Sequence, residues 1–175
     1  MYSLNVPVPG EVSRLAADLF PQLVGFDRVR ERHTLLVKRL GDEDFYTLES
    51  RLRQALAGAP AFEARVTGID SFEQPPRGPG PVVYLAIESP GLVELHKRLA
   101  ATFEPVAGLE GDDYTPHITL GRGGSLDVDI DPITWTVSQL ELFDAKHREV
   151  ASRIRLPARV RAGRPAPRRP CLRRS

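Results

Sequence analysis

The order of the apolar patterns along the chain is the feature that most limits its fold. Alternation with period two predicts strands at residues 2–8, 32–40, 61–72, 81–89, 117–122, 131–145 and 149–157. Helical spacing of apolar residues predicts helices at 12–23, 42–58 and 89–103, the second ending at Gly58 and the third capped by Ser89 with Pro90 in its first turn. The order β-α-β-α-β-β-α-β-β-β mixes helices with hairpins, so it favours an α+β fold over a doubly wound sheet.

Charge divides the chain into two parts. Residues 158–175 contain seven of the 24 Lys and Arg residues, no Asp or Glu, and three prolines. This composition predicts a disordered basic tail, which either binds RNA through phosphate contacts or is a solvated extension. Residues 1–157 have 17 basic and 23 acidic residues, and we expect them to form one domain.

Several classes of protein are disfavoured. The single cysteine, Cys171, excludes an internal disulfide and a cysteine-based zinc site. The first residues have neither a basic leader nor a long apolar run, so we expect a cytoplasmic protein without a membrane segment. We also expect a monomer without a cofactor.

The segment DDYTPHITLGR, residues 112–122, combines a titratable group with a hydroxyl. In a strand, His117 and Thr119 project from one face, while Ile118 and Leu120 project from the other. One face is therefore apolar and the other is polar and chemically reactive.

A second histidine has a similar setting. His33 opens the predicted strand RHTLLVKRL, and a basic residue follows five positions after each histidine, Lys38 and Arg122. His96 has the spacing of a residue at the edge of the core, and His147 falls in a polar turn. No two histidines have metal-ligand spacing, so a metal site is not expected. The alternative is that His33 and His117 are ordinary residues at strand ends.

The motif YTPHITLGR resembles the second signature of the two-histidine (2H) phosphoesterase superfamily, and the layout resembles its 2'-5' RNA ligase and RNA 2',3'-cyclic phosphodiesterase branch. The resemblance implies a bilobal α+β fold in which two antiparallel sheets face a central cleft, with helices packed outside. His117 and Thr119 match the second motif. His33 matches the histidine of the first motif, but Leu35 stands at its hydroxyl position and the threonine is at Thr34. In a regular strand, Thr34 would point away from the face of His33.

The resemblance implies catalysis by His33 and His117, one as general base and one as general acid, without a metal. Thr119 would donate a hydrogen bond to the phosphate, and Arg122 or Lys38 would stabilise its charge; Thr34 completes the predicted substrate-binding set. The expected reaction is hydrolysis of 2',3'-cyclic phosphates of RNA ends or cyclic nucleotides to 2'-phosphates, with possible 2'-5' RNA ligation in vitro. Two alternatives stay open. One is an RNA-end or nucleotide binding protein with weakened or lost catalysis, and the other is an enzyme for a small nucleotide such as a cyclic phosphate of ADP-ribose.

Overall fold

The computed structural model describes residues 1–158, so the predicted basic tail lies outside the described residues except for Ala158. Nine strands, three α-helices and two short 3-10 helices alternate along the described chain. In chain order they are β1 (Tyr2–Val6), α1 (Gly10–Leu19), η1 (Phe20–Leu23), β2 (Arg28–Val29), β3 (Leu35–Gly41), α2 (Phe45–Ala55), β4 (Phe62–Phe72), β5 (Val82–Glu88), α3 (Pro90–Ala100), η2 (Gly111–Asp113), β6 (His117–Arg122), β7 (Ile133–Val137), β8 (Gln139–Asp144) and β9 (Glu149–Arg155).

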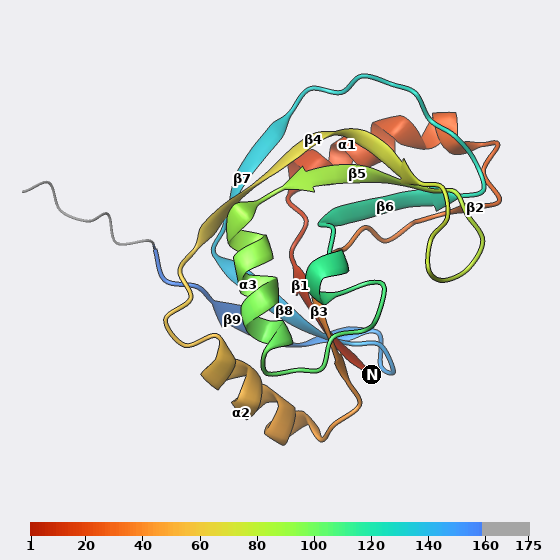
Figure 1. The fold of residues 1–175 in the computed structure, drawn as a ribbon. Coiled ribbons are helices and arrows are strands. Elements are labelled where there is room, and N and C mark those ends of the chain that lie inside the picture. The colour runs from red at the N-terminus through yellow and green to blue at the C-terminus, as the bar shows by residue number, and fades with distance from the viewer. Residues whose placement is uncertain (159–175) are drawn as a thin grey trace, which may run out of the picture.

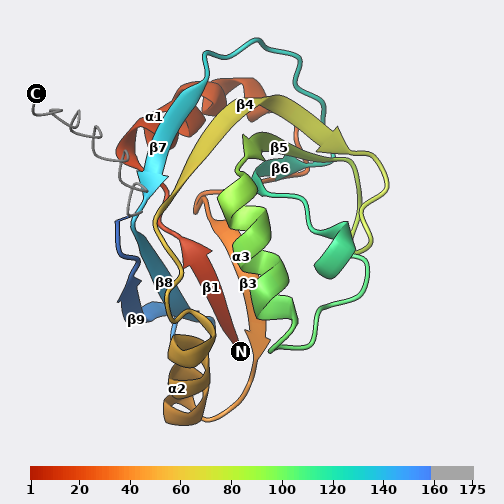
Figure 2. The same ribbon diagram turned by 60° about the vertical axis from the view of Figure 1, so that its left-hand side comes forward.

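The strands form two antiparallel sheets. One has the order β3-β1-β8-β9 and the other the order β2-β6-β5-β4-β7. The helices α2 and α3 lie beside the four-stranded sheet, and α1 lies behind the five-stranded sheet (Figures 1 and 2). The two sheets and their outer helices confirm the predicted α+β architecture.

Local sequence signals explain where the helices begin and end. The Ser89 hydroxyl accepts a hydrogen bond from the Leu92 N–H at 3.2 Å, which caps α3 as predicted. The Asp44 carboxylate caps α2 in the same way by accepting from the Thr47 N–H. Gly58, with φ of +74°, follows the end of α2 in a conformation that favours glycine. None of the helices within residues 1–158 is long and apolar enough to cross a membrane.

Three details differ from the sequence-based expectation. The single strand predicted at 131–145 is divided at Ser138 into β7 and β8, which belong to different sheets. The two-residue strand β2, which pairs with β6, was not predicted. The strand β3 begins at Leu35, so His33 lies in the segment before the strand and does not open it.

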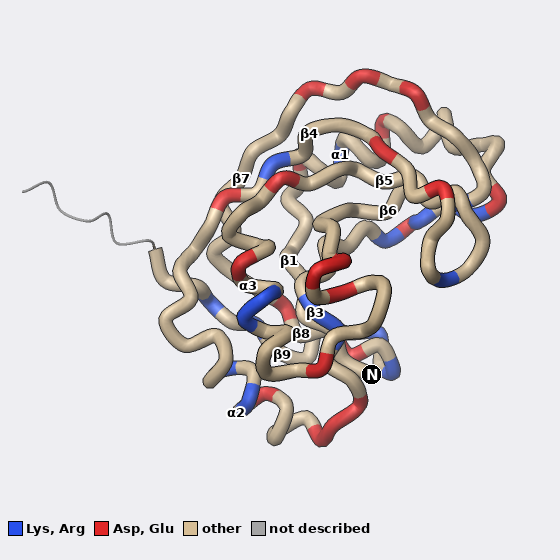
Figure 3. The backbone as a smooth tube through the Cα atoms, in the orientation of Figure 1, with Lys and Arg blue, Asp and Glu red and all other residues tan. Residues whose placement is uncertain are grey.

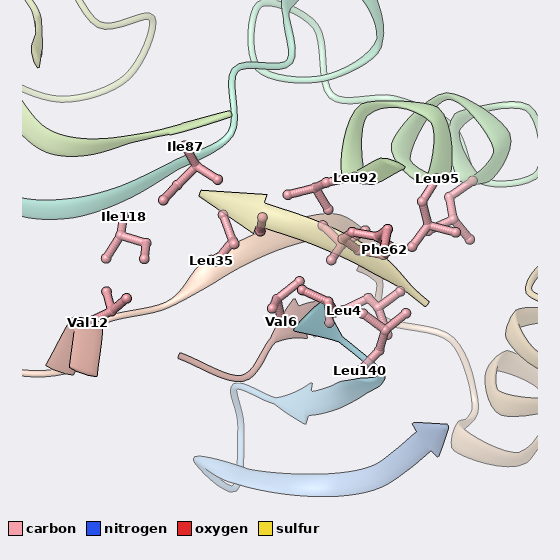
Figure 4. Close-up of a cluster of buried hydrophobic side chains, with 14 of the residues drawn as sticks. Leu4, Val6, Val12, Leu35, Phe62, Ile87, Leu92, Leu95, Ile118 and Leu140 are labelled. Atoms are coloured by element: carbon pink, nitrogen blue, oxygen red, sulfur yellow. The ribbon is translucent and has the colours of Figure 1, made fainter. Parts of the chain in front are cut away.

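One continuous core joins the two sheets. Buried side chains of β1, β3, β6 and β8 belong to the same apolar cluster as those of α1 and α3. In the close-up, Val12 of α1 lies next to Ile118 of β6 (Figure 4). Because successive residues of a strand face opposite sides, the side of β6 that carries His117 is the one turned away from α1.

Candidate functional site

The strands β3 and β6 have the same internal irregularity. In β3, Leu4 of β1 pairs with Lys38 while Asn5 pairs with Leu36, so Val37 is an extra residue. In β6, Val83 of β5 pairs with Gly121 while Tyr84 pairs with Thr119, so Leu120 is an extra residue. The bulged residues Val37 and Leu120 are 83 positions apart, and β3 has a second register shift at Leu40 near its end.

This register makes residues 34–39 the structural counterpart of residues 117–122. Counted from the bulge, Leu36 corresponds to Thr119 and Arg39 corresponds to Arg122. Leu36 and Arg39 are partly exposed, whereas the Leu35 side chain is wholly buried. The counterpart of His117 is then Thr34, which is exposed. The prediction that Leu35 takes the hydroxyl position is wrong, because its side chain belongs to the core.

His117 lies in a partly aromatic environment. Its ring is 5.2 Å from the Tyr84 ring and 5.1 Å from the Phe72 ring, centroid to centroid. Its Nδ1–H donates to the carbonyl of Thr115 at 2.7 Å, which leaves Nε2 as the proton-accepting nitrogen of the neutral ring. Tyr84 is also the cross-strand partner of Thr119.

The surroundings of His117 favour its neutral form. Burial lowers the pKa of His117, the Thr115 carbonyl opposes this shift, and the positive charges of Arg39 and Arg122 lower the pKa further. At neutral pH the imidazole is thus mainly unprotonated. A neutral imidazole with a free Nε2 is suited to act as a general base.

The structure places His33 in different surroundings. His33 lines a hollow of about 630 Å³ together with four residues of α1 and η1: Ser13, Ala16, Ala17 and Phe20. Burial lowers the pKa of His33 as well. Since α1 covers the side of β6 opposite to His117, this geometry does not support a direct approach of the two imidazoles. Their pairing as acid and base stays a prediction.

Lys38, predicted to bind the substrate, faces the interior. Its side chain is 0% exposed, and its ammonium donates to Glu110 at 2.6 Å and to the carbonyls of Arg39 and Glu104, both at 2.9 Å. All three of its donors are occupied. The bulge at Val37 places Lys38 toward the core and Arg39 outward, so Lys38 is not available to a substrate.

The loop that leads into β6 is held against β3 by polar contacts. His96 of α3 donates from Nδ1 to the Val37 carbonyl at 2.7 Å and accepts the Gly111 N–H at Nε2. Its ring stacks on Tyr114 at 3.8 Å, and the Tyr114 hydroxyl donates to the Leu36 carbonyl. Burial disfavours ionisation of Glu110, but Lys38 and backbone N–H groups hold the pKa of Glu110 below its usual value. These contacts fix the chain immediately before His117.

Several arginines lie near the end of β3 and the β4–β5 loop. Arg39, Arg51 and Arg77 line a hollow of about 740 Å³ between the end of β3 and the β4–β5 loop. Arg122 donates from Nη1 to the carbonyls of Arg77 and Pro79, which ties the same loop to β6. Glu43 and Glu104 line the same hollow, and Arg39 and Arg51 pair with Glu110 and Glu43, so the charges in this hollow have both signs.

Sequence reasoning missed Arg39, Tyr84 and Phe72. Arg39 is adjacent to the predicted Lys38, and only the bulge shows which of the two faces outward. The two aromatic residues come from β4 and β5, and their approach to His117 depends on strand register, which no local pattern contained.

Within residues 1–158, no three His, Cys, Asp or Glu side chains gather closely enough to form a metal site.

Fold and site together define a class of protein with two antiparallel sheets and a histidine–threonine strand flanked by arginines. Residues 33–151 match the family model of the 2'-5' RNA ligase superfamily. The chain therefore belongs to this superfamily of 2H phosphoesterases, which confirms the resemblance of its motif. A comparison with curated protein sequences gives no match.

Solved structures share the fold. TT0787 of Thermus thermophilus is 22% identical with a TM-score of 0.63, covering 90% of this chain and 98% of its own. LigT of Escherichia coli, in its apo form, is 22% identical with a TM-score of 0.60, covering 89% of this chain and 96% of its own. LigT in complex with 3'-AMP is 21% identical with the same TM-score, covering 89% of this chain and 97% of its own. At this level of identity the likeness shows the fold alone.

Proposed function

We propose that this protein is a metal-independent phosphodiesterase that hydrolyses 2',3'-cyclic phosphates of RNA ends or nucleotides. The observation that carries the proposal is the environment of His117. Its Nε2 has no hydrogen-bond partner within residues 1–158, Thr119 follows on the same face of β6, and the charges of Arg39 and Arg122 lower its pKa. This set offers a base, a hydroxyl donor and a positively charged environment to one phosphate.

The residues have distinct roles in this reaction. Neutral His117 accepts a proton from water through Nε2, and the water oxygen bonds to phosphorus. The bond from phosphorus to the 3' oxygen breaks, and that oxygen takes up a proton as the 2'-phosphate forms. Thr119 donates a hydrogen bond to a non-bridging oxygen, and Arg39 stabilises the charge that grows in the transition state. His33 is the second predicted catalytic histidine; it lies beside α1, and its part in the acid–base pair stays a prediction.

Structural neighbours support a nucleotide ligand. LigT of Escherichia coli has been crystallised with 3'-AMP, with ATP and with phosphate. We infer the same general chemistry for this chain, a phosphate group attached to a nucleoside. Ligation of RNA ends would use the same groups, with a 5'-hydroxyl in place of water attacking phosphorus while the bond to the 3' oxygen breaks, which leaves a 2'-5' linkage.

One observation favours a second candidate function. The positions that correspond to His117 and Thr119 are Thr34, just before β3, and Leu36 within it; neither supplies an imidazole, and Leu36 supplies no hydroxyl. A site with a single imidazole binds a phosphate through its arginines but transfers protons less effectively. The second candidate is therefore a nucleotide or RNA-end binding protein with weakened catalysis.

Turnover of purified protein separates the two candidates. A 2',3'-cyclic nucleotide and an RNA with a cyclic-phosphate end are incubated with and without EDTA, and the 2'-phosphate product is quantified. His117→Ala should lower kcat by about 100- to 10,000-fold, the usual contribution of a general base. His147→Ala, which removes a histidine from a surface turn, is the matched control and should change kcat less than twofold.

The outcomes are distinct. Turnover that survives EDTA and collapses in His117→Ala supports the phosphodiesterase. Binding of the cyclic nucleotide without turnover supports the binding protein. A rate that disappears with EDTA and returns with added zinc or magnesium contradicts the proposed mechanism.

A further inference from the structure

A small basic hollow lies at the other end of β6 from His117. It has a volume of about 170 Å³ and is lined by Arg28, Val29, Arg30, Gly121 and Arg122. Three of these five residues are arginines, and none is acidic. In the backbone tube, Lys and Arg positions gather along β2 and the C-terminal end of β6 (Figure 3).

The pairing of β2 with β6 brings like charges together. Arg28 and Arg122 are direct cross-strand partners, and like charges in that relation are destabilising. Among the described residues, none of the three arginines takes part in a salt bridge, although seven such pairs occur elsewhere. Two carboxylates are adjacent in sequence, but neither lines the hollow: Asp27 lies against the turn at Gly123, and Glu31 lines the separate hollow beside α1. The fold thus maintains a repulsive cluster that an anion would stabilise.

The backbone fixes one of these guanidinium groups in place. Nη1 of Arg122 donates to the carbonyls of Arg77 at 3.1 Å and Pro79 at 2.9 Å. Nη2 and Nε have no such contact among the described residues and can receive a ligand. A cation oriented in this way loses little freedom when it binds an anion, which is the condition for a selective phosphate contact.

The hollow lies on the strand that carries the reactive histidine. Arg122 is five positions after His117, so their Cα atoms are roughly 15 Å apart along a strand. A ligand that reaches both has at least two phosphates separated by more than one sugar. A cyclic mononucleotide has only one phosphate and cannot occupy both places.

We propose that Arg28, Arg30 and Arg122 form a second anion site, which binds a backbone phosphate of an RNA chain whose cyclic-phosphate end lies at His117. The inference rests on the proposed function for the location of the RNA end. The site makes an oligonucleotide a better ligand than a mononucleotide. Phosphate is also present in free nucleotides such as ATP, so the experiment must separate the RNA chain from a polyphosphate.

The test is a charge-matched comparison of two double variants. Arg28→Ala/Arg30→Ala removes two charges from the site, and Arg14→Ala/Lys146→Ala removes two exposed charges from elsewhere. Binding of a fluorescent single-stranded RNA with a cyclic-phosphate end is measured by anisotropy at several salt concentrations, in proteins that also contain His117→Ala so that turnover does not intervene. Binding of ATP is measured in parallel.

The site variant should bind RNA at least tenfold more weakly, and the slope of log affinity against log salt should become shallower by about 1.4, since each lost contact to a single strand contributes about 0.7. The control variant should stay within twofold of the parent. In proteins with His117 intact, the ratio of kcat/KM for RNA to that for the cyclic mononucleotide should fall at least tenfold in the site variant.

Equal RNA affinity in the site and control variants would overturn the proposal. So would a loss of ATP binding with RNA binding unchanged, which would assign the site to a polyphosphate. If the protein shows no turnover, the proposed function fails, but the anisotropy comparison still decides whether the second anion site exists.

Discussion

An exchange of the residues at positions 33 and 34 tests the correspondence between β3 and β6. The variant His33→Thr/Thr34→His moves the imidazole by one Cα position, about 3.8 Å along the chain, and to the other side of the extended backbone. The imidazole then has the position in β3 that His117 has in β6. The composition of the chain does not change.

The structure permits a large gain from this exchange. Position 34 is exposed, so the ring enters no packed region, and the neighbouring side chains of Leu35 and Val37 are wholly buried and stay in the core. A positioned acid or base contributes about 100- to 10,000-fold in rate, which corresponds to about 2.7 to 5.4 kcal/mol of transition-state stabilisation. We expect kcat to rise at least 100-fold with KM within a few-fold of the parent value.

The assay is steady-state hydrolysis of a 2',3'-cyclic nucleotide, with melting temperatures measured to show that each variant is folded. Addition of His117→Ala to the exchange variant should abolish the gain, because both imidazoles are needed. The correspondence would be refuted if the exchange lowered kcat and His33→Ala alone lowered it as much as His117→Ala. His33 would then be the working partner of His117.

Three further predictions concern the structure around the site. Lys38→Met leaves Glu110 buried without its partner and should lower the free energy of unfolding by about 3 to 5 kcal/mol in urea denaturation; an unchanged midpoint would show that the pair is solvated. Leu35→Thr should lower the free energy of unfolding by about 2 to 4 kcal/mol without raising kcat, because it places a hydroxyl in the core. Leu36→Thr, by contrast, should raise kcat about tenfold at an unchanged melting temperature. Burial lowers the pKa of His96, so below the unfolded value of 6.5 the unfolded chain binds a proton that the folded protein resists. Stability should therefore fall as pH decreases below 6.5, and His96→Gln should flatten this dependence in thermal melts between pH 7 and 5; an equally steep curve in the variant would assign the effect to other groups.

The local pattern of apolar and capping residues was sufficient to predict most of the helices and strands. The N-cap at Ser89 and the stop at Gly58 depend on residues within one helical turn, so they were readable without tertiary contacts. The segment at 131–145 was misread because a period-two pattern continues unchanged when a chain crosses from one sheet to another at Ser138. Alternation shows which residues share a face but not which sheet they belong to.

The second motif and the family were determined by the sequence alone. His117 and Thr119 share a face of β6 because alternation within a short strand needs no outside partner. The first motif was a different case. A bulge inserts one residue into the count, and its position depends on hydrogen bonds to a neighbouring strand that lies far away in the chain. Only the tertiary structure could decide that Lys38 and Leu35 face the core while Arg39 faces outward, because a one-residue change in register reverses the direction of every side chain that follows.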